Sequence, residues 1–136
     1  MKRKINGFTL LELLVVIGII GILVALATVS YSTTQKSSRD ARRKQDMVAI
    51  QNALEQYYSE NVFKYPNGMC ATAVVNMKSE WPVDPDGSNY IQSCTGDAYC
   101  VCALMEKAGS GNAGPSSGST CDFNGNKNYY CVSNLQ

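Results

Sequence analysis

A long apolar run near the amino terminus constrains this 136-residue chain more than any other feature. No charged residue lies between Leu13 and Val29, and Glu12 is the one charge between the run and Phe8. About 20 predominantly apolar residues are needed to carry a helix across a bilayer. Residues 8–31 are therefore predicted to form a transmembrane helix.

Basic residues flank this run on both sides. Lys2, Arg3 and Lys4 precede it, and such charges favour a cytoplasmic N-terminus. Residues 36–44 carry further basic charges, which weakens the asymmetry. Because a leader of residues 1–7 can only stay inside or be cut off, we expect the rest of the chain to lie outside the cytoplasm.

The pattern changes from apolar to amphipathic beyond the run, so residues 32–64 are predicted to form an amphipathic helix. Apolar side chains recur there at helical spacing, at Met47, Ile50, Leu54, Tyr57 and Tyr58. No proline or glycine lies between Ile22 and Tyr65, so one helix can run from Phe8 to about Phe63, a length of roughly 84 Å. Tyr65-Pro66-Asn67-Gly68 is expected to end it.

The remaining residues, 65–136, are predicted to form a small globular head. Strand-like segments separated by turns occur at about Asn89–Ser93, Tyr99–Met105 and Asn128–Ser133. The low-complexity stretch at residues 109–120 is expected to be an exposed loop. The predicted fold class is α+β, with a long N-terminal helix packed on a small antiparallel sheet.

All six cysteines lie in the head, at Cys70, Cys94, Cys100, Cys102, Cys121 and Cys131. The chain has no histidine and no C-x-x-C pair, which argues against a metal site. Six cysteines in a short chain indicate disulfides and an oxidising compartment. The sequence leaves all 15 pairings open.

Composition and charge argue against two broad classes of function. The net charge is +1, which is too small for an electrostatic nucleic-acid binder. Without histidine, and without a nucleophile beside a base, no enzyme site is recognisable. We therefore expect no catalytic activity and no nucleic-acid partner.

Two groups of charged residues could have functional roles. Residues Arg39, Asp40, Arg42, Arg43, Lys44 and Asp46 form a charged collar after the apolar run. The collar is either a solvated helix face with intrahelical pairs or a contact for anionic lipid and acidic residues of a neighbour. Asp84, Asp86 and Asn89 lie in a turn, which is either a plain β-turn or a calcium site.

Glu12 is unusual because it lies within the apolar segment. A carboxylate at that place costs about 2.5–3.5 kcal/mol on insertion scales and normally has a partner. We find no partner for it within the segment. Glu12 therefore either reaches the headgroup level or pairs with another chain.

The N-terminal residues K-R-K-x-N-G followed by F-T-L-L-E-L resemble the class III signal sequence of type IV prepilins and pseudopilins. The resemblance is close over residues 2–27 and looser through residues 53–66, ALEQYYSENVFKYP, which are similar to the major pseudopilin of type II secretion. It implies a pilin-like subunit of a filament that assembles from the membrane.

The resemblance also implies how the chain is processed. A prepilin peptidase would cut between Gly7 and Phe8 and would methylate Phe8. Glu12 would then pair with the N-terminal ammonium of a neighbouring subunit. An assembly ATPase and a platform protein would build the filament. The major pseudopilin holds calcium in its head, but the resemblance is loose there, and disulfides could provide the same stapling. A plain β-turn is therefore favoured over a calcium site.

The apolar run departs from the family at one place. Val29 stands where many members carry proline. Gly18 and Gly21 remain as weak points of the helix, at a cost of about 1 kcal/mol each relative to alanine. They favour local helix loosening during assembly or close helix approach, although glycine is also ordinary in membrane helices.

Four accounts of the whole chain remain open. The cysteine-rich head slightly favours a pilin of a type IV pilus, at the cell surface, with related minor pilins as partners. Residues 53–66 favour the pseudopilin alternative. The chain could instead be a single-span membrane-anchored binding module that keeps its leader. It could also be a secreted protein cut after Ala25-Leu26-Ala27, with Thr28 as its first residue.

Overall fold

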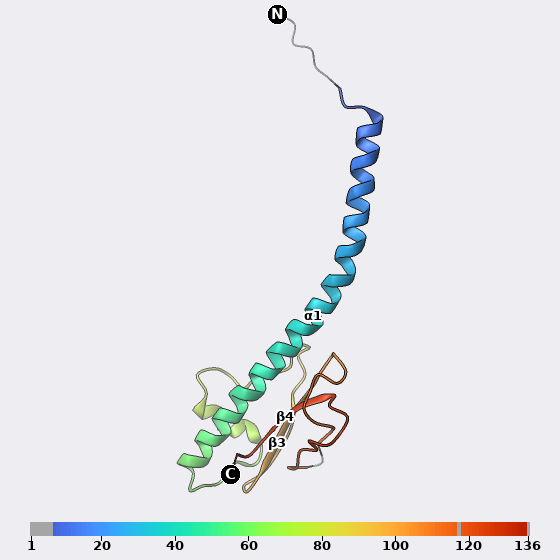
Figure 1. Ribbon diagram of the computed structural model, residues 1–136. Coiled ribbons are helices and arrows are strands. Elements are labelled where there is room, and N and C mark those ends of the chain that lie inside the picture. The colour runs from blue at the N-terminus through green and yellow to red at the C-terminus, as the bar shows by residue number, and fades with distance from the viewer. Residues whose placement is uncertain (1–6, 117, 136) are drawn as a thin grey trace, which may run out of the picture. The chain divides into compact units, whose positions relative to one another are not determined.

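The computed structural model describes residues 7–116 and 118–135 (Figure 1). The elements in chain order are α1 (Leu10–Glu60), β1 (Asn67–Gly68), the 3-10 helix η1 (Cys70–Asn76), β2 (Ile91–Thr95), β3 (Tyr99–Leu104) and β4 (Tyr129–Ser133). The chain divides into two compact units, Met1–Gln35 and Lys36–Gln136, and α1 contributes to both.

In the first unit, α1 presents apolar side chains all round. The large apolar residues from Leu10 to Leu26 are between 47% and 80% exposed. The helix contains a window apolar and long enough to cross a membrane, by length and composition. A helix that is apolar on every face is stable only when lipid or other helices surround it.

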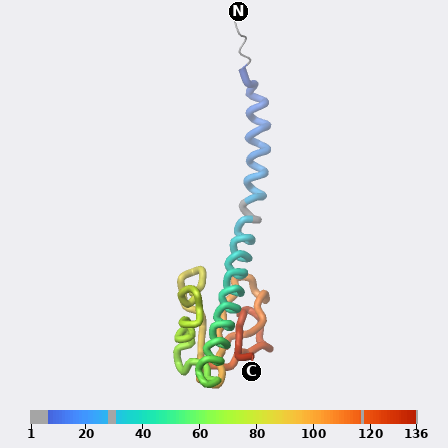
Figure 2. Tube along the Cα trace, turned by 90° about the vertical axis from the view of Figure 1, so that its left-hand side faces the viewer, coloured from blue at the N-terminus to red at the C-terminus, as the bar shows by residue number. Residues whose placement is uncertain are grey.

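In the second unit, which we call the head, α1 packs against a four-stranded antiparallel sheet of order β1-β2-β3-β4 (Figure 1). Each strand pairs with its neighbour in sequence, and β3 and β4 align Cys102 with Cys131. In Figure 2, residues 70–90 lie along one side of α1, and the C-terminal residues that include β4 lie along the other. The predicted α+β class is confirmed.

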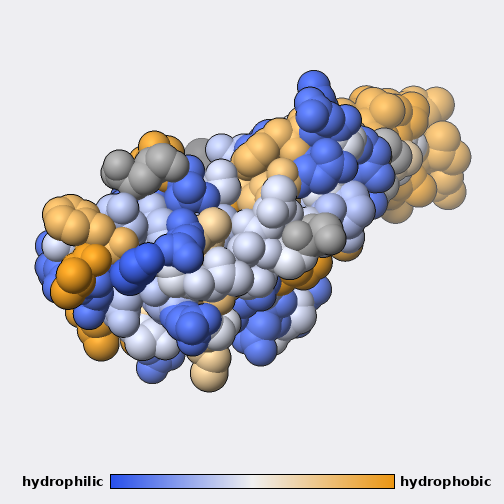
Figure 3. All heavy atoms as spheres, turned by 90° about the horizontal axis from the view of Figure 1, so that it is seen from below, coloured by the Kyte–Doolittle hydropathy of each residue, from blue (hydrophilic) through white to orange (hydrophobic). Residues whose placement is uncertain are grey.

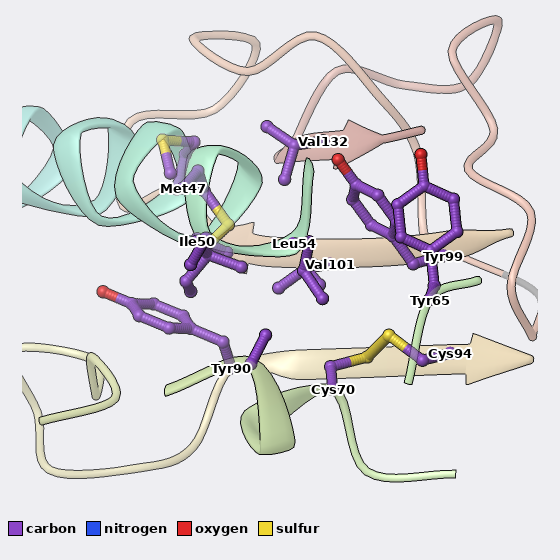
Figure 4. Packing of buried hydrophobic residues seen from close by; sticks show 14 residues of the cluster. Met47, Ile50, Leu54, Tyr65, Cys70, Tyr90, Cys94, Tyr99, Val101 and Val132 are labelled. Atoms are coloured by element: carbon purple, nitrogen blue, oxygen red, sulfur yellow. A yellow bond between two sulfur atoms is a disulfide. The ribbon is translucent and has the colours of Figure 1, made fainter. Parts of the chain in front are cut away.

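The core of the head lies between α1 and the sheet. Met47, Ile50 and Leu54 are fully buried on one face of α1, and they meet Val101 and Tyr99 of β3 (Figure 4). These helix residues belong to the amphipathic stripe that the sequence predicts. The outer surface in Figure 3 is largely hydrophilic over the head, as a solvated domain requires.

The elements end close to the predicted positions, with some differences. Helix α1 ends at Glu60, before the expected Phe63, because Val62 and Phe63 take positive φ angles of 54° and 55°. Left-handed residues of this kind end a helix. The two-residue strand β1 and the helix η1 are not predicted by the sequence pattern.

The expectation of an exposed loop at residues 109–120 is partly wrong. Ala113 is fully buried and bridges Tyr129 of β4. The Asn112 side chain accepts a hydrogen bond from the Cys131 N–H at 2.7 Å and donates one to the Cys131 carbonyl at 2.9 Å. The edge of β4 has unpaired backbone groups, and this segment satisfies them despite its loop-like composition.

All six cysteines form disulfides, and the structure selects one of the 15 pairings. The bonds join Cys70 to Cys94, Cys100 to Cys121, and Cys102 to Cys131. The first links η1 to β2, and the last links β3 to β4. The second holds the loop before β4 against β3. The first two bonds therefore tie loop-rich parts of the small head to its sheet, and the third ties two strands of the sheet together.

Candidate functional site

The N-terminal end of α1 is closed by a capping box between Thr9 and Glu12. The Thr9 N–H and hydroxyl both donate to Glu12 Oε2 at 2.8 Å. In return, the Glu12 N–H donates to Thr9 Oγ1 at 3.2 Å. The two residues thus satisfy backbone N–H groups that the first turn of a helix otherwise leaves unpaired.

Glu12 thus has a partner within its own segment, and the expectation that it has none is wrong. Thr9 stands three residues before Glu12, which is the T-x-x-E spacing of a capping box. That spacing is visible in the sequence and could have identified the partner. Among the described residues, Glu12 Oε1 accepts no hydrogen bond, so half of the carboxylate is left for another group.

The predicted cleavage site lies just before the capping box. Phe8 is 83% exposed, and a side chain added at Gly7 would meet no atom within 4 Å. The peptide bond between them is thus not covered by other described parts of the chain. Residues 1–6, which make up the rest of the predicted leader, lie outside the described residues.

Gly18 and Gly21 lie inside α1, which continues through both without interruption. A Cβ atom added at either glycine would meet nothing within 4 Å. No close contact among the described residues therefore requires a glycine at these positions. Local loosening of the helix in a filament remains a prediction for both.

The charged collar contains the expected intrahelical pair, between Asp40 and Arg43, but these central residues are not solvated. Asp40 and Arg43 are buried where α1 packs on the rest of the head. The Arg43 guanidinium donates to both carboxylate oxygens of Asp84 at 2.7 Å, to Asp40 at 2.9 Å and to Glu106 at 3.0 Å. Asp84 and Glu106 lie 41 and 63 positions away, so local sequence cannot reveal this cluster.

The outer collar residues also have contacts within the head. Arg39 donates through two nitrogens to Glu106. The Lys44 ammonium lies 5.4 Å from the centre of the Tyr130 ring, within range of a cation–π contact. Asp46 accepts a 2.6 Å hydrogen bond from the Tyr90 hydroxyl. Arg42 is exposed and is the collar residue best placed to meet lipid or a neighbour.

Hydrogen bonds shift the pKa values of the collar's acidic partners. The hydrogen bond from the Arg39 guanidinium is the main cause that lowers the pKa of Glu106 to about 2. Arg43 lowers this pKa further, and desolvation acts in the opposite direction. Burial alone would raise the pKa of Asp40. The backbone N–H groups of Glu106 and Lys107, with Arg43, outweigh burial and lower it. Both carboxylates are therefore held in their charged forms.

The turn proposed for calcium is already engaged elsewhere. Both oxygens of Asp84 face the Arg43 guanidinium, and Oδ1 also accepts from the Asp86 N–H at 3.1 Å. Asp86 Oδ1 accepts from the Ser88 N–H at 2.8 Å, as in an Asx turn. Asn89 is exposed in the same turn. These contacts are those of a β-turn held by an arginine.

Four cysteine sulfurs gather in one place, at Cys100, Cys102, Cys121 and Cys131. They lie within 4.8 Å of one another, a spacing that four thiolates around a metal ion could also have. All four are bonded in pairs as disulfides, so this oxidised cluster has no thiolate to offer. The cluster is a structural staple of the head.

Comparison with known proteins finds matches to the N-terminal segment and to most of the chain. Residues 2–28 match the family described as the prokaryotic N-terminal methylation motif. The chain is 30% identical over 132 residues to the type II secretion system core protein G of Pseudomonas aeruginosa, covering 82% of this chain and 92% of that protein. No solved structure gives a significant match.

Two further relatives match over shorter regions. The type II secretion system core protein G of Aeromonas hydrophila is 40% identical over 65 residues, which are 48% of this chain and 45% of that protein. The type IV major pilin protein PilA of Myxococcus xanthus is 39% identical over 55 residues, which are 40% of this chain and 25% of that protein. The chain thus spans less than half the length of each of these two relatives.

Together, the N-terminal motif, the long match and the fold place this chain in a family. It belongs to the type IV pilins and type II secretion pseudopilins. The members of this family are structural subunits.

Proposed function

We propose that this chain is a non-enzymatic structural subunit of a type IV pilus-like filament. A prepilin peptidase cleaves it between Gly7 and Phe8 and methylates Phe8. The subunit waits in the cytoplasmic membrane, and an assembly ATPase and platform protein insert it into a polymer of its own copies and related minor pilins. No nucleic acid is required.

The observation that carries this proposal is the exposed apolar surface of α1 between Leu10 and Leu26. A surface of this size is not tolerated in water and must be covered by lipid or by protein. Lipid and packed helices are similarly apolar, so a subunit can move from one to the other at a small net cost. That property suits a reversible polymer drawn from a membrane.

Glu12 supplies the specificity of this assembly. Its Oε2 is held by Thr9, and its Oε1 is left for a donor from another chain. Cleavage after Gly7 would create an ammonium at Phe8, which has no paired charge of its own. A carboxylate and an ammonium from two subunits are each costly alone in an apolar surrounding and tolerable together. Their pairing would set the register between neighbours.

Substitutions at Glu12 separate the capping role from the charge. Glutamine can replace glutamate in a capping box, but it carries no charge. We expect Glu12→Gln to keep the helix start, to be cleaved normally, and to lose most filament incorporation. Thr9→Ala weakens the cap by about 1 kcal/mol and leaves the charge in place, so it should lose less.

The readout is the yield of sheared or purified filament per amount of processed subunit in the membrane. Wild-type yield from Glu12→Gln would contradict the charge-pairing role. A loss from Glu12→Gln no larger than that from Thr9→Ala would assign Glu12 to capping alone. Retention of the leader in wild-type protein would instead favour a single-span anchored module.

A second candidate is the major pseudopilin of a type II secretion system. The match along 92% of the Pseudomonas aeruginosa core protein G favours it. Both candidates polymerise through the same N-terminal helix, and they differ in whether the filament serves a pilus or a secretion system. Deletion of the gene in its native host distinguishes them: loss of surface filaments supports the pilus, and accumulation of secreted enzymes within the cell envelope supports the pseudopilin.

A further inference from the structure

Three carboxylates from three parts of the head converge on one buried guanidinium. Asp40 comes from α1, Asp84 from the turn before β2, and Glu106 from the residues after β3. Each lies within 3.0 Å of an Arg43 nitrogen. Arg43 thus joins all three segments through one side chain.

The hydrogen-bond geometry engages all three nitrogens of the guanidinium. Nε and Nη2 bind the two oxygens of Asp84, and Nη1 binds Asp40 and Glu106. The Arg43 side chain is 5% exposed, and that of Asp84 is 8% exposed. Paired charges as buried as these are costly to break, because removal of one partner leaves the other uncompensated.

The same residues do not fit a calcium ion. Calcium takes six to eight oxygen ligands at about 2.3–2.6 Å, with carboxylates as the main charged ligands. Asp84 is the buried carboxylate of the candidate turn, and the Arg43 guanidinium already faces both of its oxygens. A divalent cation at Asp84 would have to lie beside a fixed positive charge or displace it.

We propose that Arg43 takes the place of a bound divalent cation in the head, so that the head remains folded without calcium. The guanidinium is part of the chain and satisfies the three carboxylates at every calcium concentration. This inference concerns the head alone and does not depend on which filament the subunit serves.

The test uses the full-length chain purified in detergent micelles. Its thermal unfolding is followed by circular dichroism in excess EDTA and again in millimolar calcium chloride. We expect the two melting temperatures to agree within about 2 °C, since a ligand that does not bind the native state does not shift it. A melting temperature that falls in EDTA and returns with calcium would overturn the proposal.

Arg43→Gln and Arg42→Gln form a matched pair, since both remove one positive charge from adjacent positions. Arg42 is exposed, and we expect its substitution to change the melting temperature by no more than about 2 °C. Arg43→Gln should lower it by at least about 10 °C, because three carboxylates lose their common partner. Equal effects of the two substitutions would contradict the proposal.

If Arg43→Gln does not fold, Arg43→Lys provides the second comparison. Lysine keeps the charge but cannot make the two parallel bonds to Asp84. We expect a melting temperature below that of the wild type and, again, no response to calcium. Wild-type stability in Arg43→Lys would show that the two parallel bonds are dispensable and would overturn the assignment to the guanidinium.

Discussion

One carboxylate on α1, that of Glu55, contacts several parts of the head. Glu55 accepts hydrogen bonds from the hydroxyls of Tyr65 and Tyr99 and from the Leu135 N–H, at 3.0–3.1 Å. Burial raises the pKa of Tyr99, and the Glu55 charge adds to the effect. Glu55 therefore connects α1 to β3 through a partly buried polar contact and to the C-terminal residues through an exposed one.

Tyr99→Phe tests this connection. The substitution keeps the buried ring and removes one hydrogen bond to a charged acceptor, so we expect a loss of about 1–2 kcal/mol in the free energy of unfolding. Urea denaturation of the detergent-purified chain measures it. Tyr57→Phe is the control, because the half-buried Tyr57 hydroxyl has no hydrogen-bond partner among the described residues, and its loss should stay below about 0.5 kcal/mol.

The collar also predicts how stability depends on pH. Folding lowers the pKa of Glu106 from its ordinary value of 4.5 to about 2, and it also lowers that of Asp40. The contribution of these two carboxylates to folding stability is fully present above their pKa values in the unfolded chain. It is lost as the pH falls through their pKa values in the folded protein. The melting temperature should therefore fall as the pH drops from about 4.5 toward 2. Glu106→Gln should flatten this decline, and an equally steep decline would contradict the assignment.

At the scale of elements, the spacing of residue types along the chain predicts the buried face of the helix and the positions of the strands. The spacing of Met47, Ile50 and Leu54 predicts the buried face of α1, because helix geometry repeats every 3.6 residues. The segments rich in β-branched and aromatic residues locate β2, β3 and β4 within about two residues. The capping box at Thr9 likewise follows from a local spacing, T-x-x-E, that the sequence shows.

Contacts between distant segments were not predictable in the same way. Arg43 meets Asp84 and Glu106 only because the sheet brings both beside α1. The disulfide pairing depends on the register of β3 and β4, which places Cys102 opposite Cys131. The role of residues 112–114 at the edge of β4 likewise depends on tertiary contact, which composition does not encode.

The edge of β4 gives a prediction at this scale. A Cβ atom at Gly111 would lie 1.9 Å from the Tyr129 carbonyl oxygen, so this close approach admits only glycine. Gly111→Ala should displace the segment from β4 and cost about 2–3 kcal/mol in unfolding free energy. Thr120→Ala, at an exposed position of the same loop, is the control and should be near neutral. Equal stability of the two variants would contradict the close approach.

At the scale of the whole molecule, the net charge of +1 conceals an uneven chain. Residues 36–46 are rich in basic charge, whereas the residues after 46 carry an acidic excess. Apolar surface is concentrated in the first unit, and the head is stabilised by disulfides and buried ion pairs. These properties fit a subunit with an apolar polymerising segment and a stable solvated head.

The central claim is that the mature subunit begins at Phe8 and assembles through the helix that follows. Intact-mass and N-terminal peptide mass spectrometry of the protein purified from its native host test this claim most directly. We predict a mature chain that starts with N-methylated Phe8. A chain that starts at Thr28, or one that keeps residues 1–7 in its filaments, would contradict the account.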